Sequence, residues 1–360
     1  MKIVGVKLFH YVLPFKIPVI IQERKIQGRE GFLLELKDSD GICAYGEIAP
    51  LVGRSKETLK TILQEMKGVR NFLLQTQLPT HFGSLEGKLQ KLFQPCRPSW
   101  DVQFGLEMAL LNMRAHQKKI PLFATFSETE KTFLPLNGLV LDTSSMKEID
   151  SLIHQGYQTL KIKVRAQNLK QEIKNILAIQ RAYGEEVILR LDANQSLTFD
   201  QAIELGKTIG PAIEYIEEPF ADIERIPEFY EETLIPVALD EALGQYEISK
   251  IQSISGVEVL VVKPSTLGGL EASWQLAQQA RGRGLHVVIS SSFESGVGLL
   301  TLGHFALGVS RTTAAGLDTL KYFEKDLLKK TLTIMHGNLD LHSTVHTEDL
   351  NFDLLEEVQL

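Results

Sequence analysis

The sequence predicts a closed barrel of alternating strands and helices, preceded by a smaller domain of mixed strands and helices. From about residue 132, strand-like and helix-like patterns alternate, and they yield eight candidate strands within fewer than 200 residues. Helical patterns such as 169–183, 199–209 and 270–283 lie between them. The candidate strands are 133–141, 159–164, 187–193, 213–217, 237–240, 257–263, 286–290 and 314–318.

The alternative is an open, doubly wound parallel sheet, which usually needs fewer strands and binds nucleotides through a glycine-rich loop. The nearest match to that loop is Gly296-Val297-Gly298, but Thr301 stands where the third glycine should fall. The absence of the motif favours the barrel.

The region 1–130 is expected to form a small α+β domain. Residues 31–37 and 42–48 have the composition of two strands, and the turn 38–41 between them is rich in residues that tolerate tight turns. Two helices are expected, one at 59–72 with Ser55 as its N-cap and one at 99–115.

The alternation stops near residue 318, so we expect the barrel at 131–320 and a separate C-terminal segment at 321–360. Within that segment, 332–341 has the pattern of a hairpin about His336-Gly337-Asn338, and an acidic tail follows. We expect the segment to return to the N-terminal domain, because the edge of that domain's sheet would otherwise stay uncovered.

Composition indicates an ordinary globular protein. The 360 residues are 44% hydrophobic and 23% charged, and the net charge of −7 without a basic block argues against nucleic acid as a partner. Lysines interrupt every candidate export signal near the N-terminus, and no run approaches the ~18 apolar residues of a membrane span. Cys43 and Cys96 show neither a disulfide framework nor metal-binding spacing. We therefore expect a cytoplasmic protein without a membrane partner; monomer and homo-oligomer both stay open.

The strand 159–164 carries two lysines within an otherwise apolar run. Lys161 and Lys163 are two residues apart, so both side chains emerge on the same face of the strand. An edge strand with two solvated lysines would explain them, but the apolar flanks indicate a strand covered on both faces. A buried lysine needs an anionic partner, so we expect acidic groups nearby.

Acidic residues do follow the next strands. Asp192, Glu217 and Asp240 stand at the ends of three consecutive candidate strands, and Lys263 ends the one after them. The intervals from Lys163 onward are 29, 25, 23 and 23 residues, each about one strand-helix unit, so the groups should converge at one mouth of the barrel. Three converging carboxylates suit a divalent cation such as Mg²⁺, although ion pairs with the lysines could also neutralise them. We give Glu218 and Glu241 no direct role.

The order Lys-x-Lys, Asp-x-Asn, Glu-Glu-Pro, Asp-Glu and Lys-Pro resembles the muconate-lactonizing branch of the enolase superfamily, over nearly the whole chain. The resemblance implies a modified (β/α)₇β barrel with an α+β capping domain built from the N-terminal region and the C-terminal tail. The mandelate racemase branch is excluded, because it would place a histidine base on the seventh strand. Here that strand ends in Ser290-Ser291-Ser292, and His286 lies at its opposite end.

Within this branch the chain is most similar to the o-succinylbenzoate synthase family of menaquinone biosynthesis. That similarity implies dehydration of 2-succinyl-6-hydroxy-2,4-cyclohexadiene-1-carboxylate, a small-molecule carboxylate, to 2-succinylbenzoate. It also implies Mg²⁺ at Asp192, Glu217 and Asp240, with Mn²⁺ as a substitute. The similar segments are 28–31, 46–51, 263–265, 268–269, 290–295 and 316–319.

The resemblance also implies roles for the three lysines. Lys163 would remove the proton α to the carboxylate, and Lys263 would oppose the charge that develops on the ring. Lys161 would tune Lys163 and neutralise the carboxylate. The physical chemistry agrees, because a lysine beside another cation can act as a general base and the enediolate that forms needs cations around it.

The substrate-binding residues are less constrained. Arg190 is expected either to orient the substrate or to pair with Glu217, and Gly268 either to offer backbone N–H groups or only to form a turn. Val52 and Arg54 stand where the family usually has a proline and a phenylalanine in this loop. The expected substrate-binding residues are Arg190, Asn194, Ser265, Gly268, Ser290 and Ser292.

Two other functions are open. An N-succinylamino acid racemase or dipeptide epimerase would use Lys163 and Lys263 on opposite faces of one carbon, but Gln195-Ser196 stands where such enzymes favour an aromatic residue nearby. A binding or scaffold protein without chemistry would gain nothing from the converging charged strand ends.

Overall fold

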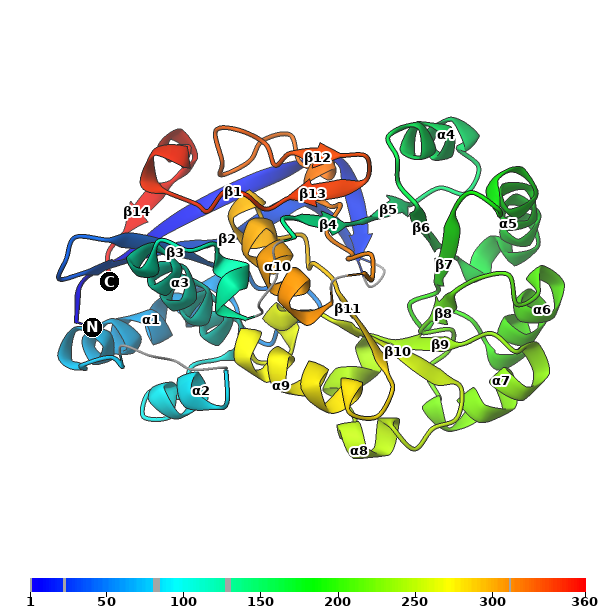
Figure 1. Cartoon of the computed structure of the whole chain (residues 1–360), viewed down its shortest axis with the longest axis horizontal. Coiled ribbons are helices and arrows are strands. Elements are labelled where there is room, and N and C mark those ends of the chain that lie inside the picture. The colour runs from blue at the N-terminus through cyan, green and yellow to red at the C-terminus, as the bar shows by residue number, and fades with distance from the viewer. Residues whose placement is uncertain (1, 22–23, 80–84, 127–130, 311) are drawn as a thin grey trace.

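The molecule consists of a barrel and an antiparallel domain that lies beside it (Figure 1). The structure is a computed structural model that describes residues 2–21, 24–79, 85–126, 131–310 and 312–360. Both termini lie in the antiparallel domain, at the end away from the barrel (Figure 1). The predicted boundary at residue 130 falls outside the described residues.

Seven parallel strands make the barrel sheet, in the order β11-β10-β9-β8-β7-β6-β5. Seven of the eight predicted strands are therefore confirmed, with shorter bounds. The strands are β5 (Asn137–Val140), β6 (Thr159–Lys163), β7 (Ile188–Asp192), β8 (Tyr215–Glu217), β9 (Val237–Leu239), β10 (Val257–Val262) and β11 (His286–Ile289).

The eighth predicted strand, 314–318, is reduced to single bridges that nonetheless close the ring. Ala315 forms a parallel bridge with Leu136, and Gly316 forms one with Ser290. Backbone N–H groups bond on both sides, from Asn137 to the carbonyl of Ala315 at 2.9 Å and from Gly316 to that of Ile289 at 2.8 Å. The sheet thus returns upon itself, as a (β/α)₇β barrel requires.

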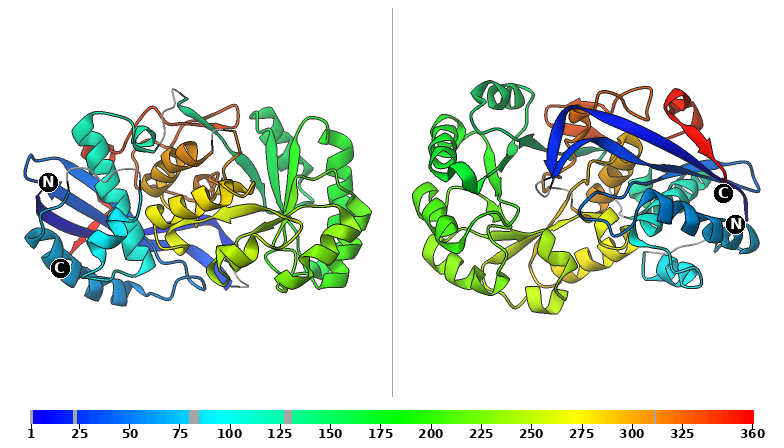
Figure 2. Two further views of the ribbon diagram at one scale, coloured as in Figure 1. Left: turned by 60° about the horizontal axis from the view of Figure 1, so that its bottom comes forward. Right: turned by 180° about the vertical axis from the view of Figure 1, so that it is seen from behind.

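Each barrel strand is followed by a helix on the outer face (Figure 2), so that the strands are covered on both sides and can be apolar throughout. Helix α5, for example, buries Ile173, Ile176 and Ile179 at helical spacing against the sheet. The helices are α4 (Met146–His154), α5 (Leu169–Tyr183), α6 (Phe199–Ile209), α7 (Ile226–Thr233), α8 (Ile248–Ile251), α9 (Leu270–Arg281) and α10 (Gly296–Val309).

The second domain, which we call the cap, is an antiparallel sheet with helices packed on it. Its strand order is β14-β1-β2-β3, and the predicted pair of strands with its turn is confirmed as β2 and β3. Sequence reasoning missed the long first strand β1, which carries two prolines. The elements are β1 (Ile3–Ile21), β2 (Arg24–Asp38), β3 (Cys43–Ile48), β14 (Glu356–Val358), α1 (Leu59–Gln75), α2 (Lys88–Phe93) and α3 (Trp100–Lys118).

Helix α3 joins the cap to the barrel and is buried almost throughout, from Asp101 to Met113. It contacts β3 on one side and α9 on the other. Glycines allow the close approach to β3, since a Cβ on Gly46 would lie 1.9 Å from the carbonyl oxygen of Gly105. The cap is therefore packed rigidly where α3 passes, and its loops are held at a fixed height over the barrel.

One local prediction, that Ser55 is the N-cap of the first helix, was wrong. The N-cap of α1 is Thr58, whose side chain accepts from the N–H of Thr61. Ser55 instead accepts a hydrogen bond from the N–H of Leu51 at 2.9 Å and donates one to Asp101 at 3.1 Å. It therefore fastens the preceding loop to α3 and does not start α1.

The C-terminal segment divides between the two domains. The predicted hairpin is present as β12 (Ile334–Met335) and β13 (Asn338–Asp340), but it pairs with β4 (Phe133–Pro135), which leads into the barrel, and not with the cap sheet. The tail behaves as expected, because β14 pairs with β1 and covers that edge.

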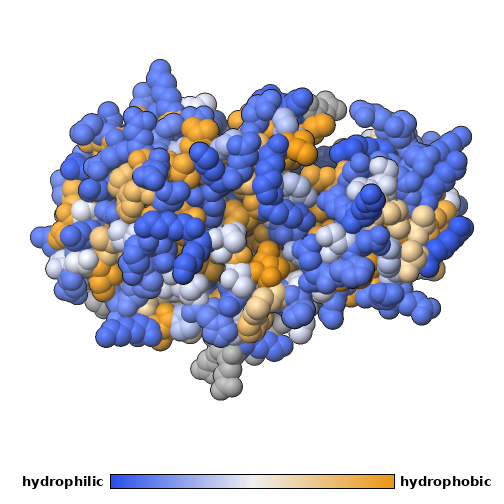
Figure 3. Space-filling view, turned by 90° about the horizontal axis from the view of Figure 1, so that it is seen from above, coloured by the Kyte–Doolittle hydropathy of each residue, from blue (hydrophilic) through white to orange (hydrophobic). Residues whose placement is uncertain are grey.

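None of the helices among the described residues has the length and apolar content needed to cross a membrane. The face seen in Figure 3 is mainly hydrophilic, and its hydrophobic residues form small groups.

Candidate functional site

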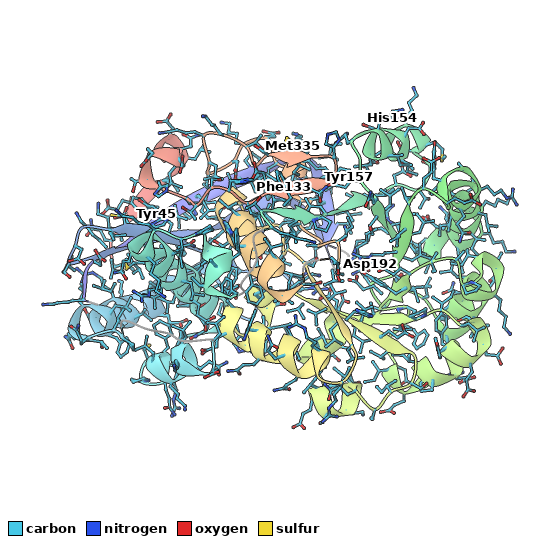
Figure 4. The ribbon with its side chains drawn as sticks, viewed as in Figure 1. Tyr45, Phe133, His154, Tyr157, Asp192 and Met335 are labelled. Carbon is cyan, nitrogen blue, oxygen red and sulfur yellow. The ribbon has the colours of Figure 1, made fainter. Side chains whose placement is uncertain are left out.

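The charged residues of the barrel stand in register at one end of its sheet. In the register of β6 and β7, Lys161 lies opposite Arg190 and Lys163 lies opposite Asp192. In the register of β7 and β8, Asp192 lies opposite Glu217. Side chains at the same level of a closed parallel sheet lie side by side. Figure 4 shows Asp192 on the inner side of the barrel, away from the ring of helices. The predicted convergence is confirmed.

Lys161 is enclosed between two carboxylates. Its Nζ lies 2.9 Å from Oδ2 of Asp192 and 2.6 Å from Oε2 of Glu217. Burial disfavours the charged lysine, but the two acids outweigh it and hold the pKa of Lys161 well above its usual value. Lys161 is thus a permanent cation within the strand layer.

Lys163 lies one step nearer the mouth and is less enclosed. Its Nζ donates to Oδ2 of Asp192 and to Oδ1 of Asn194, both at 2.6 Å. Burial works against the charged form of Asp192, but Lys161 and Lys163 outweigh it and keep the pKa of Asp192 well below its usual range. Asp192 therefore stays ionised and shared between two lysines.

Lys263 faces the cavity from the other side of this group, just after β10. Its Nζ lies 2.5 Å from Oδ2 of Asp240, the residue that follows β9. Arg54, from the cap, binds the same carboxylate in a fork with distances of 3.0 and 2.9 Å. Burial favours the neutral form of Asp240, but Lys263 and Arg54 outweigh it and hold the pKa of Asp240 well below its usual range.

The three lysines, Asp192 and Arg54 line one cavity of about 470 Å³ under the cap, whereas Glu217 and Asp240 lie behind its wall. This size is typical of small-molecule sites, which span roughly 300–1,000 Å³. Both domains contribute, because β1 and the loop after β3 form part of the wall. The lining includes Val19, Ile20, Leu51, Arg54, Lys161, Lys163, Asp192, Asn194, Glu241, Lys263, Ser290, Ser291, Ser292, Phe293, Asp318 and Thr319.

Glu217 is the least satisfied acid of the site. It is 0% exposed, and its Oε1 has no hydrogen-bond partner among the described residues. Burial, followed by the neighbouring charge of Asp192, raises the pKa of Glu217 to about 8 despite Lys161. A buried carboxylate with a free oxygen is a costly arrangement unless a further cation is bound.

The chemistry of the donors fits a hard divalent cation. Asp192, Glu217 and Asp240 offer carboxylate oxygens from three adjacent strand ends, which is the donor type that Mg²⁺ prefers. As the side chains stand, no three His, Cys, Asp or Glu groups within the described ranges are arranged to hold a metal ion, because lysines and Arg54 occupy the carboxylates. Binding a cation there requires an exchange of partners.

Of the six predicted substrate-binding residues, Asn194, Ser290 and Ser292 line the cavity. Arg190 does not: it is buried and donates to Glu214 at 2.5 Å and to the carbonyl of Ala314 at 2.7 Å. Its carboxylate partner is Glu214 and not the predicted Glu217. Arg190 thus ties β7 to the segment that closes the barrel.

Ser265 and Gly268 also lie outside the cavity lining. Ser265 is buried and donates to Ser292 at 3.1 Å and to Glu294 at 2.9 Å, so it supports a residue that does line the cavity. Gly268 has a φ of +86° and borders Trp100 of the cap, which favours its second interpretation as a turn.

Sequence reasoning missed two charged residues of the site. Neither Arg54 nor Glu241 is among the residues that the sequence predicts for the site. Glu241 lines the cavity, contacts Arg54, and accepts from Nδ2 of Asn194 at 3.2 Å. Glu218 does support the site from behind, because its Oε1 accepts from the N–H of Asp240 at 2.8 Å.

Comparison with known proteins agrees with this geometry. A family model described as "Enolase C-terminal domain-like" matches residues 145–345, and one described as "MenC, N-terminal domain" matches residues 3–113. The o-succinylbenzoate synthase of Aliivibrio fischeri is 31% identical, over 93% of this chain and 94% of that protein. The chloroplastic protein PHYLLO of Arabidopsis thaliana is 30% identical over 86% of this chain, which spans only 20% of PHYLLO.

Solved structures share the fold. An N-succinyl Arg/Lys racemase from Bacillus cereus is 22% identical and superposes over the full length of both chains with a TM-score of 0.86. A dipeptide epimerase from Enterococcus faecalis, solved with Mg and a dipeptide, is 20% identical, covers 96% of this chain and 98% of that chain, and has a TM-score of 0.84. The predicted fold class is confirmed. The chain is an enzyme that belongs to the o-succinylbenzoate synthase family of the enolase superfamily.

Proposed function

We propose that the chain is a Mg²⁺-dependent dehydratase that converts 2-succinyl-6-hydroxy-2,4-cyclohexadiene-1-carboxylate to 2-succinylbenzoate and water, as a step of menaquinone biosynthesis. One observation carries the proposal: Lys163 and Lys263 face the same cavity from separate strand ends, with three ionised or ionisable carboxylates between them. The names of the relatives support the choice of substrate.

Lys163, in its neutral form, is the base of the proposed reaction. It takes the proton from the ring carbon that bears the carboxylate, and Asn194 and Asp192 hold its Nζ in place at 2.6 Å. The electron pair left on the ring then expels the neighbouring hydroxyl group, and the ring becomes aromatic. Lys163, now an ammonium group, returns the proton to the leaving hydroxide, so that water is the second product. A positioned base of this kind typically contributes about 10²–10⁴-fold.

The other cations oppose the charge that develops on the substrate. Lys161 stays protonated between Asp192 and Glu217 and lies directly behind Lys163. Lys263 faces the ring from the other side of the acids. Mg²⁺ held by Asp192, Glu217 and Asp240, for which Mn²⁺ substitutes, would supply Lewis-acid stabilisation of the substrate carboxylate, worth several kcal/mol.

The test is an assay of the cyclohexadiene acid that follows the loss of diene absorbance and the formation of 2-succinylbenzoate. The unaltered chain with Mg²⁺ should convert the acid, and Lys163→Ala should convert it about 10²–10⁴-fold more slowly. Lys170→Ala, a surface lysine of α5, serves as the control and should behave like the unaltered chain. Conversion by Lys163→Ala at the unaltered rate would refute the proposed base.

A second candidate is a racemase or epimerase of N-succinylamino acids or dipeptides. The placement of Lys163 and Lys263 on two sides of one cavity favours it, because each could exchange a proton on one face of the α-carbon. Incubation with N-succinyl amino acids in D₂O tests this function. Absence of α-deuterium in the recovered amino acid would exclude it, whatever the outcome of the dehydration assay.

A further inference from the structure

Arg54 reaches from the cap into the barrel and occupies one of the proposed metal ligands. Its two terminal nitrogens bind both oxygens of Asp240, and one of them also contacts Glu241. The side chain is only 12% exposed and lines the cavity. A planar guanidinium is matched to a carboxylate in this two-pronged way, and the same fork would fit a carboxylate of a ligand equally well.

The ion pairs of the site form a set whose formal charges cancel. With Lys163 protonated, as it is before it acts as a base, and with every acid ionised, four cations (Arg54 and the three lysines) are joined to four anions, the acids at 192, 217, 240 and 241. A divalent cation added to this set leaves an excess of two positive charges in a buried region. Two carboxylates on one ligand remove that excess, so the site balances when a divalent cation and a dicarboxylate are bound together.

We propose that Arg54 is a specificity-determining residue that exchanges Asp240 for the second carboxylate of the substrate when Asp240 takes up the divalent cation. This inference rests on the proposed function, since it presupposes a metal at Asp240 and a dicarboxylate in the cavity. Glu241 stays beside Arg54 throughout, so that the guanidinium keeps one anionic partner during the exchange.

Of the two cations that bind Asp240, Arg54 and Lys263, Arg54 is the one whose two nitrogens form a fork with the carboxylate and could form the same fork with a ligand. Lys161 is enclosed between two strands, and Lys163 is engaged by residues of its neighbouring strand. Arg54 projects from a loop, while that loop is fixed on both sides of it: Arg29 donates to the carbonyls of Ala49 and Pro50, and Ser55 bonds back to the N–H of Leu51. The side chain can therefore turn from Asp240 to a ligand while the loop stays in place.

Metal binding without substrate gives the first test. We would titrate Mg²⁺ into the unaltered chain, Arg54→Gln, Arg54→Lys and the control Lys56→Gln by calorimetry, and check folding by circular dichroism. Lys56 is an exposed cation of the same segment, stacked near Trp100 and outside the cavity. Because Arg54 competes for Asp240, Arg54→Gln should bind Mg²⁺ about tenfold more tightly, and Lys56→Gln should match the unaltered chain.

Ligand binding gives the second test. In the presence of Mg²⁺, the unaltered chain should bind 2-succinylbenzoate at least about tenfold more tightly than benzoate, which has one carboxylate; in Arg54→Gln this preference should fall to about twofold or less. Arg54→Lys keeps the charge but not the fork, so it should lie between the two. If Arg54→Gln does not fold, Arg54→Lys decides the question by the same measurements.

The outcomes separate this inference from the proposed function. Mg²⁺ affinity and ligand preference that are unchanged in a folded Arg54 variant would overturn the exchange and leave the dehydratase standing. Failure of the unaltered chain to bind Mg²⁺ or 2-succinylbenzoate would refute the proposed function, and the exchange with it.

Discussion

Replacing Lys161 with methionine removes the ammonium group that two buried carboxylates share. The ion pairs of 2.9 Å with Asp192 and 2.6 Å with Glu217 are nearly closed to solvent. Loss of one partner from such a buried arrangement costs about 3–5 kcal/mol. Lys161 lowers the pKa of Glu217, so its loss favours the protonated form of this carboxyl, which places the expected cost near the lower end, at about 3 kcal/mol.

For a chain of 360 residues, a loss of about 3 kcal/mol lowers the melting temperature by about 4 °C. Calorimetry in EDTA measures this change. Added Mg²⁺ should then raise the melting temperature of Lys161→Met by more than it raises that of the unaltered chain, because a bound cation replaces the missing charge and therefore binds the variant more tightly.

Lys207→Met is the matched control, because Lys207 pairs with Glu232 on the surface and both side chains are about half exposed. Such a pair contributes less than about 1 kcal/mol. The reasoning fails if Lys161→Met melts with the control in EDTA, or if Mg²⁺ stabilises Lys161→Met no more than it stabilises the unaltered chain.

Three further predictions follow from the site and its surroundings. EDTA should abolish conversion of the cyclohexadiene acid, and Mg²⁺ or Mn²⁺ should restore it; turnover that persists in EDTA would contradict the metal assignment. Lys163→Ala should lower turnover about 10²–10⁴-fold while Mg²⁺ binding persists in calorimetry, since the base is not a ligand; loss of Mg²⁺ binding would contradict that separation of roles. Burial raises the pKa of Glu107 from 4.5 to about 8, so its contribution to stability is full below about pH 4.5 and is lost as the pH rises to about 8. Relative to the unaltered chain, Glu107→Gln should therefore gain at most about 5 kcal/mol between pH 4.5 and pH 8 in urea unfolding, and a constant difference would contradict this.

The parts of the site that sequence reasoning could predict are those set by the barrel's own periodicity. Lys163, Asp192 and Glu217 fall in register because each strand-helix unit has nearly the same length, so charged residues at strand ends reach the same level. The same reasoning placed Asp240 and Lys263, which follow their strands directly.

The parts that could not be predicted depend on contacts between distant segments. Arg54 contacts Asp240 because the cap is packed over the mouth of the barrel. The two residues are far apart in the sequence, so no local sequence pattern predicts the contact. Arg190 lies on the same face of β7 as Asp192. Its side chain, however, donates hydrogen bonds to Glu214 and to the carbonyl of Ala314 and does not line the cavity. The segment 314–318 was expected to be a full strand, but only single bridges form there.

The most direct test of the central claim is a crystal structure of the chain with Mn²⁺ and 2-succinylbenzoate, in which anomalous scattering locates the ion. We predict one peak in the barrel cavity, in contact with Asp192, Glu217 and Asp240, with the product held between Lys163 and Lys263. A peak elsewhere, or a cavity that holds the product but has no ion at these three carboxylates, would contradict the account.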